Sequence, residues 1–588
     1  MQAVRPMYGA HVHSVNSASR RDRAPAPRRT ETVCGDVLTQ HNNNARTGAN
    51  TCETTLTPAV LRTPDFGKVF CRPVDAQIYA QPLVAQALDL PGTGVRNVVF
   101  VATMKNTVFA FDADDPRATD PLWRVNLGPA VSSTDYYPHS NEIRDSIGVL
   151  GTPVIDRAKG LLYAVAATHE PGPDGDRLYR HRLHALNLTT GDASLPSRLI
   201  EGTYPGSAPD ASGGIITFNP RMQMQRASLL LDRGRVYVAF GSHGDARPYH
   251  GWVFAYDATT LEPAGRYLTT PKSYGGGVWQ SGQGLTADSK GNVYFVGANG
   301  FGSDETDPVE RPQSIIKVRP SDDELRLADY YTPHDWHRAE DENKGLGSTG
   351  VVLIPETDLL VVGSKDGLVY VTHQSALGHI SDNDTAAVQR LWVNEKRIHS
   401  APVYWQGEAG GTLYVWGQGG HLRAFSLEPS GERFHDEPAH ISGMSAPSKG
   451  WSGSISGGTV TVSANGTRDG IVWATLGRVG KGNPEAGILR AFDANDVSVE
   501  IWNSQADAKR DAYGDFSKFV SVTVANGHVY VPTFSRELVV YGVRSATQGA
   551  AIGCGASLSS AAQPSYVVAP WLSLFWAVAA LWFGSKLG

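Results

Sequence analysis

The stretch Ser242–Trp252, SHGDARPYHGW, places two histidines and an aspartate within eleven residues. His243, Asp245 and His250 are the ligand types of the two-histidine, one-carboxylate iron site, whose ligands occupy one face of an open coordination sphere. Such a site usually draws one ligand from a distant strand, whereas the Gly, Pro and Asp residues here are typical of turns. We therefore favour a hydrogen-bonded loop and keep a metal site as the alternative.

Two further positions could take part in chemistry. Asp145 follows HSNEIR and could act as a general base beside Arg226 or Lys518, although a structural Asp–Arg pair is the more common arrangement. Trp279, in GGGVWQSGQG, could offer a stacking surface to a flat ligand, although a Trp in such a place more often packs in a core. Both roles depend on how the chain is folded around these residues.

A repeated unit supplies the scaffold for these side chains. A β-rich run, a turn or loop and a second β-rich run ending in an aromatic residue or Asp recur along the chain at a mean spacing of about 60 residues. Examples are VVFVATMKNTVFAFDA, from Val98, and HVYVPTFSRELVVYGV, from His528. Alternating Val, Tyr and Phe with Gly, Asn and Asp turns predict strands, and no convincing helix between Asp36 and Val543. The sequence therefore predicts an all-β fold, a single eight-bladed β-propeller.

Another strand precedes each unit, and we expect it to be the innermost strand of its blade. These segments read YAQPLVA, LGTPVID, QRASLLL, SGQGLTA, GSTGVVL, HSAPVYW, GGTVTVS and KFVSVTV. The last unit lacks an outer strand after Val543, whereas Phe66–Asp75, FGKVFCRPVD, precedes the first unit. We expect this N-terminal strand to complete the last blade and so close the ring.

The starts of the innermost strands predict a ring of polar side chains around one mouth of the channel. The residues at these positions are Gln81, Thr152, Arg226, Gln283, Ser348, His399, Gly457, Gly458 and Lys518. A ring that holds Gln, Arg, His and Lys could bind an anionic or quinone-like ligand, and a protein partner could dock at the same mouth. The alternative is that these groups only satisfy backbone polar groups and channel water.

Composition and cysteine spacing exclude several classes of protein. A net charge of -6 gives no basic field for a polyanion, so no nucleic-acid partner is expected, and we expect a monomer. The four cysteines, Cys34, Cys52, Cys71 and Cys554, form no C-x-x-C and no adjacent pair, which excludes zinc-ribbon and c-type haem motifs. A Cys34–Cys52 disulfide that clamps the segment before the propeller and two reduced thiols remain as alternatives.

The two ends differ from the propeller in composition. We divide the chain into a disordered leader, a propeller, a linker and a hydrophobic segment, at residues 1–33, 34–545, 546–565 and 566–583. The leader is rich in Arg, Ser, Ala and Pro and shows no secretion signal. The hydrophobic segment holds about 18 residues without a charge, roughly 27 Å if helical, which approaches a bilayer core. It fits a tail anchor or a cleaved glycolipid-anchor signal, so we expect a membrane-anchored or cell-surface protein facing outside; a helix packed on the domain is the alternative.

Several blocks of the sequence carry a resemblance to a known family. DVLTQHNNNARTGANTCETTLTPAVL, FGKVFCRPVDAQIYAQPLV, GSHGDARPYHGWVFAYDATTL and KFVSVTVANGHVYVPTFSRELVVYGV resemble secreted bacterial and fungal PQQ-like (quinoprotein alcohol dehydrogenase-like) propellers, over roughly Asp36 to Val543. For the true dehydrogenases the resemblance implies pyrroloquinoline quinone (PQQ) and calcium on the channel axis, stacked between a Trp and a disulfide of adjacent cysteines, with an Asp base. Trp279 and Asp145 would be the counterparts here, but the adjacent-cysteine wall is missing. Propellers of the outer-membrane assembly-factor type share the repeat and bind proteins without catalysis.

These observations leave three functions open. We favour a surface-associated or exported propeller that acts as a ligand-binding or protein-binding scaffold. The alternative is a quinone-dependent dehydrogenase that oxidises an alcohol or sugar, with Asp145 as the base and Arg226 or Lys518 polarising the quinone oxygen. A third is another propeller enzyme, a lyase or a glycosidase.

Overall fold

The computed structural model describes residues 34–136, 143–301, 309–447, 457–477, 486–544 and 551–555. The predicted leader and the predicted hydrophobic segment lie outside the described residues, as does most of the predicted linker. Within the described ranges, no helix combines the length and the apolar character that crossing a membrane would need.

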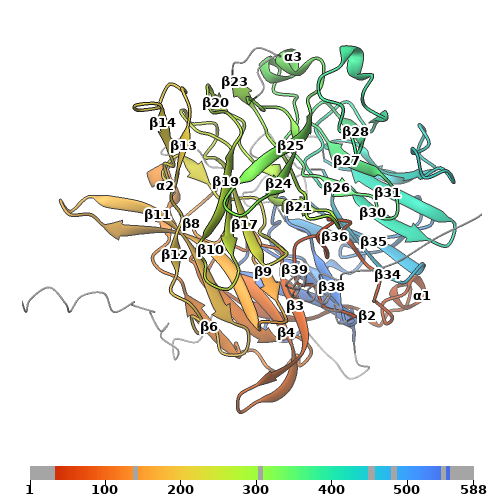
Figure 1. The fold of residues 1–588 in the computed structure, drawn as a ribbon. Helices are drawn as coiled ribbons and strands as arrows, with labels where there is room; N and C mark the ends of the chain where they lie inside the picture. The colour runs from red at the N-terminus through yellow and green to blue at the C-terminus, as the bar shows by residue number, and fades with distance from the viewer. Residues whose placement is uncertain are drawn as a thin grey trace, which may run out of the picture. The chain divides into compact units, whose positions relative to one another are not determined.

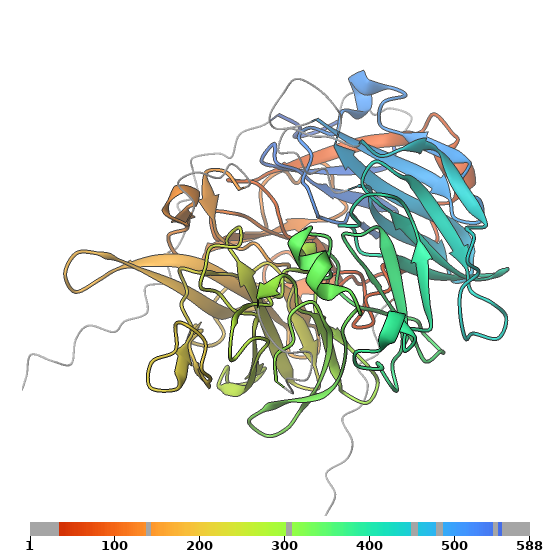
Figure 2. The same cartoon turned by 90° about the horizontal axis from the view of Figure 1, so that it is seen from above.

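Eight sheets, each built on four antiparallel strands, radiate from a common centre (Figure 1, Figure 2). From the innermost strand outward, the first four blades consist of β3 (Leu83–Leu90), β4 (Gly94–Ala102), β5 (Thr107–Asp112) and β6 (Trp123–Asn126); β9 (Val154–Asp156), β10 (Leu161–Pro171), β11 (Arg177–Asn187) and β12 (Arg198–Leu199); β16 (Leu230–Asp232), β17 (Arg235–Ser242), β18 (Trp252–Asp257) and β19 (Pro263–Leu268); and β21 (Thr286–Ala287), β22 (Val293–Val296), β24 (Ile315–Pro320) and β25 (Leu325–Tyr331). The last four consist of β26 (Val352–Leu353), β27 (Leu359–Gly363), β28 (Leu368–His373) and β29 (Gln389–Trp392); β30 (Val403–Gly407), β31 (Gly410–Trp416), β32 (His421–Ser426) and β33 (His440–Ser445); β34 (Thr459–Asn465), β35 (Arg468–Gly477), β36 (Gly487–Asp493) and β37 (Glu500–Asn503); and β38 (Thr523–Ala525), β39 (His528–Pro532), β40 (Glu537–Val543) and β2 (Phe66–Pro73).

The remaining elements are short. The additional strands are β1 (Ala49–Asn50), β7 (Val131–Ser132), β8 (Ser146–Ile147), β13 (Thr203–Pro205), β14 (Ile215–Thr217), β15 (Gln223–Met224), β20 (Tyr274–Gly275) and β23 (Gly300–Phe301). The helical turns are α1 (Pro58–Leu61), α2 (Ser133–Tyr136), α3 (Trp336–Asp341), α4 (Ala508–Asp511), η1 (Gln280–Gly282) and η2 (Asp382–Asp384). These one-turn helices correct the expectation that the propeller has none, because capped loop turns carry too little periodicity to be read from sequence.

The predicted all-β propeller, its innermost strands and its closure are confirmed. Each innermost strand falls within or overlaps its predicted segment. β2 pairs antiparallel with β40, from Phe66 opposite Val543 to Pro73 opposite Glu537. The first strand of the propeller sequence therefore completes the last blade, and no open sheet edge remains between the first and eighth blades.

The core lies between the blades. Eight separate clusters of buried apolar side chains occupy the spaces between successive blades, and one of them joins the eighth blade to the first through Phe70, Val540, Val99 and Phe109. Because a middle strand such as β17, RVYVAFGS, packs against a neighbouring blade on each face, almost all its residues are buried. Such strands read as apolar runs rather than as strict alternation.

An N-terminal segment that sequence analysis did not place fills the channel. Residues 37–53, which we call the channel plug, contact the innermost strand of every blade, and the corresponding dark red trace lies in the centre of the ring (Figure 2). In blade order, the hydrogen-bond partners of the plug are Val84, Ile155, Leu231, Ala287, Leu353, Tyr404, Val462 and Val524. These partners lie three to six residues beyond the ring positions predicted from the sequence, and at about 3.3 Å per residue this places the plug deeper in the channel than those positions.

Arg46 fixes the plug to the third and fourth blades. Its side chain is fully buried and donates to the carbonyl oxygens of Leu285 at 2.9 Å and Leu229 at 3.1 Å, and within the plug to Thr39 Oγ1 at 2.6 Å. A Cβ atom at Gly284 would lie 2.4 Å from the guanidinium, so only glycine leaves room for it. The buried cation is thus surrounded by oxygen acceptors, which offset its desolvation.

Two disulfides involve all four cysteines. The Cys34–Cys52 bond, one of the two alternatives left by the sequence, joins the ends of the plug. The Cys71–Cys554 bond joins β2 to the segment after the propeller, next to the bridge between Phe70 and Ile552. Both therefore hold chain ends against the ring.

We expect Arg46→Met to lower the free energy of unfolding by at least about 3 kcal/mol, because several buried carbonyl and hydroxyl oxygens lose their donor. The matched Arg62→Met variant, at an exposed position, should change it by less than about 0.5 kcal/mol. Chemical denaturation measures both values. Equal stabilities of the two variants would show that the plug is not an integral part of the fold.

Candidate functional site

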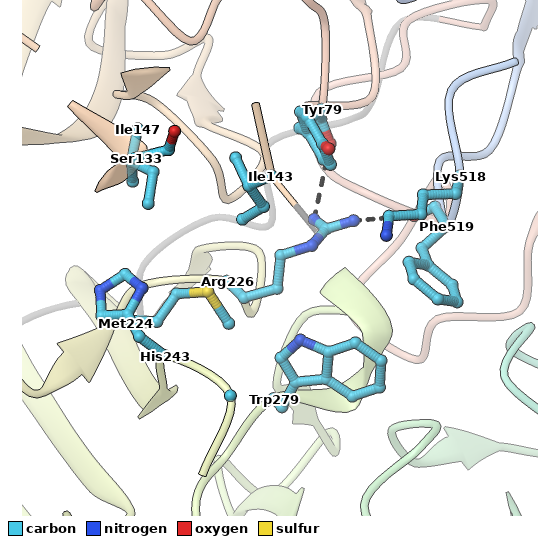
Figure 3. A pocket seen from close by; sticks show the side chains of 11 residues that line it. Tyr79, Ser133, Ile143, Ile147, Met224, Arg226, His243, Trp279, Lys518 and Phe519 are labelled. Atoms are coloured by element: carbon cyan, nitrogen blue, oxygen red, sulfur yellow. Dashed lines mark hydrogen bonds between the residues drawn. The ribbon is translucent and has the colours of Figure 1, made fainter. Parts of the chain in front are cut away.

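The mouth of the channel at the strand starts holds a cavity with two adjoining lobes. The apolar lobe, about 560 Å³, is lined mainly by Tyr79, Ile143, Ile147, Met224, Trp279 and Phe519, with Arg226 and His243 (Figure 3). The cationic lobe, about 900 Å³ including space open to solvent, is lined by Asp245, Lys365, Arg397, His399 and Lys518 among others. Trp279, Lys518 and Phe519 line both lobes. The plug lies deeper in the channel than these residues.

Arg226 precedes the innermost strand of the third blade and connects it to the first, second and eighth blades beside the apolar lobe. Its guanidinium donates to the carbonyl oxygens of Phe519 at 3.0 Å and, more weakly, Tyr79 at 3.5 Å (Figure 3). It also donates to the carbonyl oxygen of Leu150 at 3.2 Å. Burial lowers the pKa of Arg226 to about 10, so it stays charged at neutral pH. The sequence predicted that Arg226 contacts a ligand. In the structure Arg226 lines the cavity, but its guanidinium N–H groups donate to backbone carbonyl oxygens.

Three aromatic rings meet where the two lobes join. The Trp279 and Phe519 ring centroids lie 5.3 Å apart at an interplanar angle of 78°, and the Trp279 and His399 centroids lie 6.0 Å apart at 86°. Trp279 follows β20 in the segment that enters η1, whereas Phe519 precedes β38, so the rings come from opposite sides of the ring of blades. Trp279 therefore lines the cavity and is also packed against its neighbours edge to face.

His399 is buried in the cationic lobe without hydrogen-bond partners. Its relative exposure is 5%, and neither Nδ1 nor Nε2 has a partner among the described residues. Burial, together with the nearby charges of Lys365, Arg397 and Lys518, lowers the pKa of His399 to about 3. The ring is neutral at neutral pH, so one nitrogen is a donor and the other an acceptor, and both are unused.

Other predicted ring members are used inside the channel. Gln81 accepts from the backbone N–H of His41 in the plug and donates to Thr523 Oγ1, and its own N–H donates to Thr152 Oγ1. Gln283 bonds to the backbone of the fifth blade, accepting from the N–H of Gly350. These side chains join the blades and the plug, which is the alternative that the sequence left open.

Ser348 is likewise fully buried below the mouth, with a hydroxyl that has no partner among the described atoms. Of the predicted ring, Arg226, His399 and Lys518 line the cavity, and Trp279 joins them.

The three residues of the metal hypothesis do not converge. They lie in the predicted place, the loop between β17 and β18. However, His243 stacks on Tyr136 with centroids 4.0 Å apart, Asp245 accepts from the Tyr249 hydroxyl at 3.0 Å, and His250 contacts Asp210 at 3.1 Å. Within the described ranges, no three His, Cys, Asp or Glu side chains are grouped so that they could hold a metal ion. The hydrogen-bonded loop is therefore the arrangement observed.

Asp145, the candidate general base, does not line the cavity. Its carboxylate lies 3.6 Å from the Arg536 guanidinium, and its side chain is 67% exposed. It is not among the residues that line either lobe. The structural Asp–Arg pair, and not the general base, is the role that this geometry supports, although the partner differs from the arginine expected.

Several residues of the cavity were missed. Phe519 and Tyr79 adjoin predicted ring members, and Arg397 precedes His399 by two residues. Lys365 lies in the loop between β27 and β28, which corresponds to the loop that holds Asp245 in the third blade. The repeat itself carried the missing signal, because equivalent loops of different blades reach the same mouth.

The fold matches solved quinoprotein structures. The crystal structure of quinohemoprotein alcohol dehydrogenase from Comamonas testosteroni has a TM-score of 0.53 and 14% identity, covering 88% of this chain and 82% of that chain. The quinohemoprotein alcohol dehydrogenase ADHIIG from Pseudomonas putida HK5 has 0.52 and 13%, covering 90% and 82%. A europium-containing methanol dehydrogenase has 0.51 and 12%, covering 87% and 98%. No family model and no curated protein matches the chain. At this identity the likeness concerns the fold alone.

The described residues of the cavity do not reproduce a site for PQQ and calcium. Trp279 is present, but its neighbours are His399 and Phe519, and neither disulfide is formed by adjacent cysteines or lies among the lining residues. Asp245 is the one acidic residue that lines the described lobes, and it is bonded to Tyr249. A hard divalent cation prefers several carboxylate or carbonyl oxygens, whereas this lobe presents mainly cations.

Buried neutral histidines predict a stability that falls in acid. Burial lowers the pKa of six residues to about 3 or 4: His41, His181, His184, His243, His399 and His528. Between pH 6.5 and about 4 these histidines are protonated in the unfolded chain but stay neutral in the folded chain. The free energy of unfolding therefore falls as the pH falls, by up to about 1.4 kcal/mol per pH unit for each residue.

Above pH 6.5 this contribution is constant. We expect His399→Phe to reduce the pH dependence of the free energy of unfolding by the contribution of one histidine, up to about 1.4 kcal/mol per pH unit. The matched control, His435→Phe at an exposed position, should leave this pH dependence unchanged. Denaturant titrations between pH 7 and pH 4.5 measure the slope. An unaltered slope in His399→Phe would contradict a buried, neutral imidazole at this position.

Proposed function

We propose that this protein is an exported, ligand-binding propeller that captures a small anionic molecule in the cavity at the channel mouth. The observation that carries the proposal is His399, whose two buried ring nitrogens have no partner among the described residues, in a lobe lined by Lys365, Arg397 and Lys518. Leaving a buried donor and acceptor unused costs free energy, and a bound molecule that pairs with both recovers it. Among the described lining residues, three cations and one carboxylate, that of Asp245, face this lobe, and a lining of this composition favours an anion.

The plugged channel supports binding of a small molecule. Plug residues reach the innermost strands of all eight blades, so the plug occupies the channel behind the cavity. The apolar lobe beside Trp279 adds a surface for the uncharged part of the same ligand. Pockets with an apolar wall and a few convergent polar groups are typical of small-molecule sites.

Two features support export and surface attachment. All four cysteines are in disulfides, which persist in oxidising compartments. The uncharged run at residues 566–583, outside the described residues, would tether the protein to a membrane. We propose a monomer whose propeller lies on the outer side of that membrane. Mass spectrometry of the mature C-terminus tests the tether, since an intact Gly588 excludes a cleaved anchor signal.

A PQQ-dependent dehydrogenase is the second candidate. It is favoured by the fold likeness to the three dehydrogenase structures and by Trp279 at the channel mouth. If PQQ bound there, it would supply the hydride-accepting chemistry, with Lys518 and Arg397 as its charged neighbours. The missing adjacent cysteines place this function second.

A ligand screen separates the two. We expect anionic small molecules, and not their neutral analogues, to raise the Tm of the purified protein, because a ligand that binds only the folded state stabilises it. Trp279→Ala should abolish the shift while retaining the fold. Turnover of an alcohol or sugar with PQQ, calcium and an artificial dye would overturn the proposal in favour of the dehydrogenase, and so would the absence of any anionic ligand from a broad panel.

A further inference from the structure

We propose that the ligand is a phenolic acid, a hydroxyphenyl ring joined by a short aliphatic chain to a carboxylate. The Arg397 guanidinium binds the carboxylate in the cationic lobe, the ring lies in the apolar lobe, and the hydroxyl donates to the His243 imidazole. This inference rests on the proposed function and names the ligand class of the same cavity.

Arg397 presents an unpaired guanidinium to the cationic lobe. It lines this lobe, and its side chain forms no hydrogen bond and no ion pair with a described residue. Arg226, which lines the apolar lobe, is different, because its N–H groups donate to backbone carbonyl oxygens. A guanidinium offers two parallel N–H donors to one carboxylate, which a lysine ammonium cannot do. We therefore expect the carboxylate of the ligand at Arg397.

The two lobes form one continuous space. Met224, Gly244, Trp279 and Phe519 are among the residues that line both. The Trp279 and Phe519 rings meet edge to face at the junction, with centroids 5.3 Å apart. A further aromatic ring packs favourably against such a pair, because the positive edge of one ring contacts the negative face of another. A ligand held by its carboxylate in the cationic lobe can thus extend its ring into the apolar lobe.

His243 places a hydrogen-bond acceptor at the wall of the apolar lobe. It lies beside Met224 in the lining of this lobe (Figure 3), and its relative exposure is 4%. Burial lowers the pKa of His243 to about 3, so at neutral pH the ring has one N–H donor and one acceptor nitrogen. The backbone carbonyl of Gln223 accepts from the donor nitrogen, whereas the buried Nε2 has no partner among the described residues. Nε2 is then the acceptor, and a ligand hydroxyl satisfies it.

The positions of Arg397 and His243 in different lobes select a molecule with polar groups at its two ends. A fatty acid would pair with Arg397 but would bring only methylene groups to Nε2 of His243, which would stay unpaired at a cost in free energy. An uncharged phenol would pair with His243 but would leave the guanidinium without a carboxylate. Of these three classes, the phenolic acid alone satisfies both groups.

The test is isothermal titration calorimetry on the full chain at pH 7, with 3-(4-hydroxyphenyl)propionate, 3-phenylpropionate, octanoate and 4-ethylphenol as probes. We expect the hydroxylated acid to bind. 3-Phenylpropionate and octanoate should bind at least about five-fold more weakly, because they lack the hydrogen bond to His243. 4-Ethylphenol should bind at least about ten-fold more weakly, because it lacks the ion pair with Arg397.

Two variants assign the two ends of the ligand. Arg397→Gln, at a partly exposed position, should weaken the binding of both aromatic acids at least about ten-fold. His243→Phe keeps a ring against Tyr136 and should lower the affinity for the hydroxylated acid to that for 3-phenylpropionate. The matched controls Lys396→Gln and His435→Phe, at exposed positions, should change neither affinity. If His243→Phe does not fold, the comparison of the four probes on the unaltered chain still decides.

No binding of the hydroxylated acid, equally tight binding of any of the other three probes, or unaltered binding in both site variants would overturn the inference. If another anion raises the Tm and depends on Trp279 while the hydroxylated acid does not bind, the ligand-binding function stands and the phenolic-acid inference falls.

Discussion

The structure depends on the channel plug, because the innermost strands of a propeller leave unpaired backbone groups along the channel. Here residues 37–53 supply partners for all eight strands, including the parallel pairing of β1 with β34. Positive φ angles at His41, Asn42, Arg46 and Gly48 let this short segment coil within the ring. Filling the channel from one end satisfies the backbone and confines any ligand to the other end. The ring closure by β2 then holds the first and last blades together around the plug.

Two buried arginines and one buried histidine show how structural and functional polar groups differ in this protein. Arg46 and Arg226 are both desolvated, yet their guanidinium groups donate to backbone carbonyls of several blades. Their charge is used to position the chain. His399 is equally buried, but both its nitrogens lack partners among the described residues and lie beside cations. Other buried side chains also have one polar atom without a partner among the described residues, but His399 has two, and for this reason we propose that a ligand completes its hydrogen bonding.

The repeat made the propeller, its innermost strands and the β2 closure predictable, because strand periodicity and turn residues recur in every blade. The plug was not predictable in the same way: HNNNARTGAN has no apolar period, and its partners lie up to 480 residues away. The site was predicted in part. Arg226, His399 and Lys518 came from the strand starts, and Trp279 came from the segment GGGVWQSGQG. The direction of Gln81 and Gln283, by contrast, depends on plug and blade contacts that no local pattern reveals. His243, Asp245 and His250 do not converge on one point, because His243 stacks on Tyr136 and His250 contacts Asp210, and both partners come from other segments.

We propose that the channel mouth is an anion site built around His399, Lys365, Arg397 and Lys518. Anomalous diffraction from crystals soaked in sodium bromide tests it most directly, since bromide is a small anion whose position needs no chemical assumption. The account predicts an anomalous peak within contact distance of His399 and Arg397, and its loss in crystals of His399→Phe/Arg397→Gln. Bromide on the outer surface of the blades, with none in the cationic lobe, would contradict it.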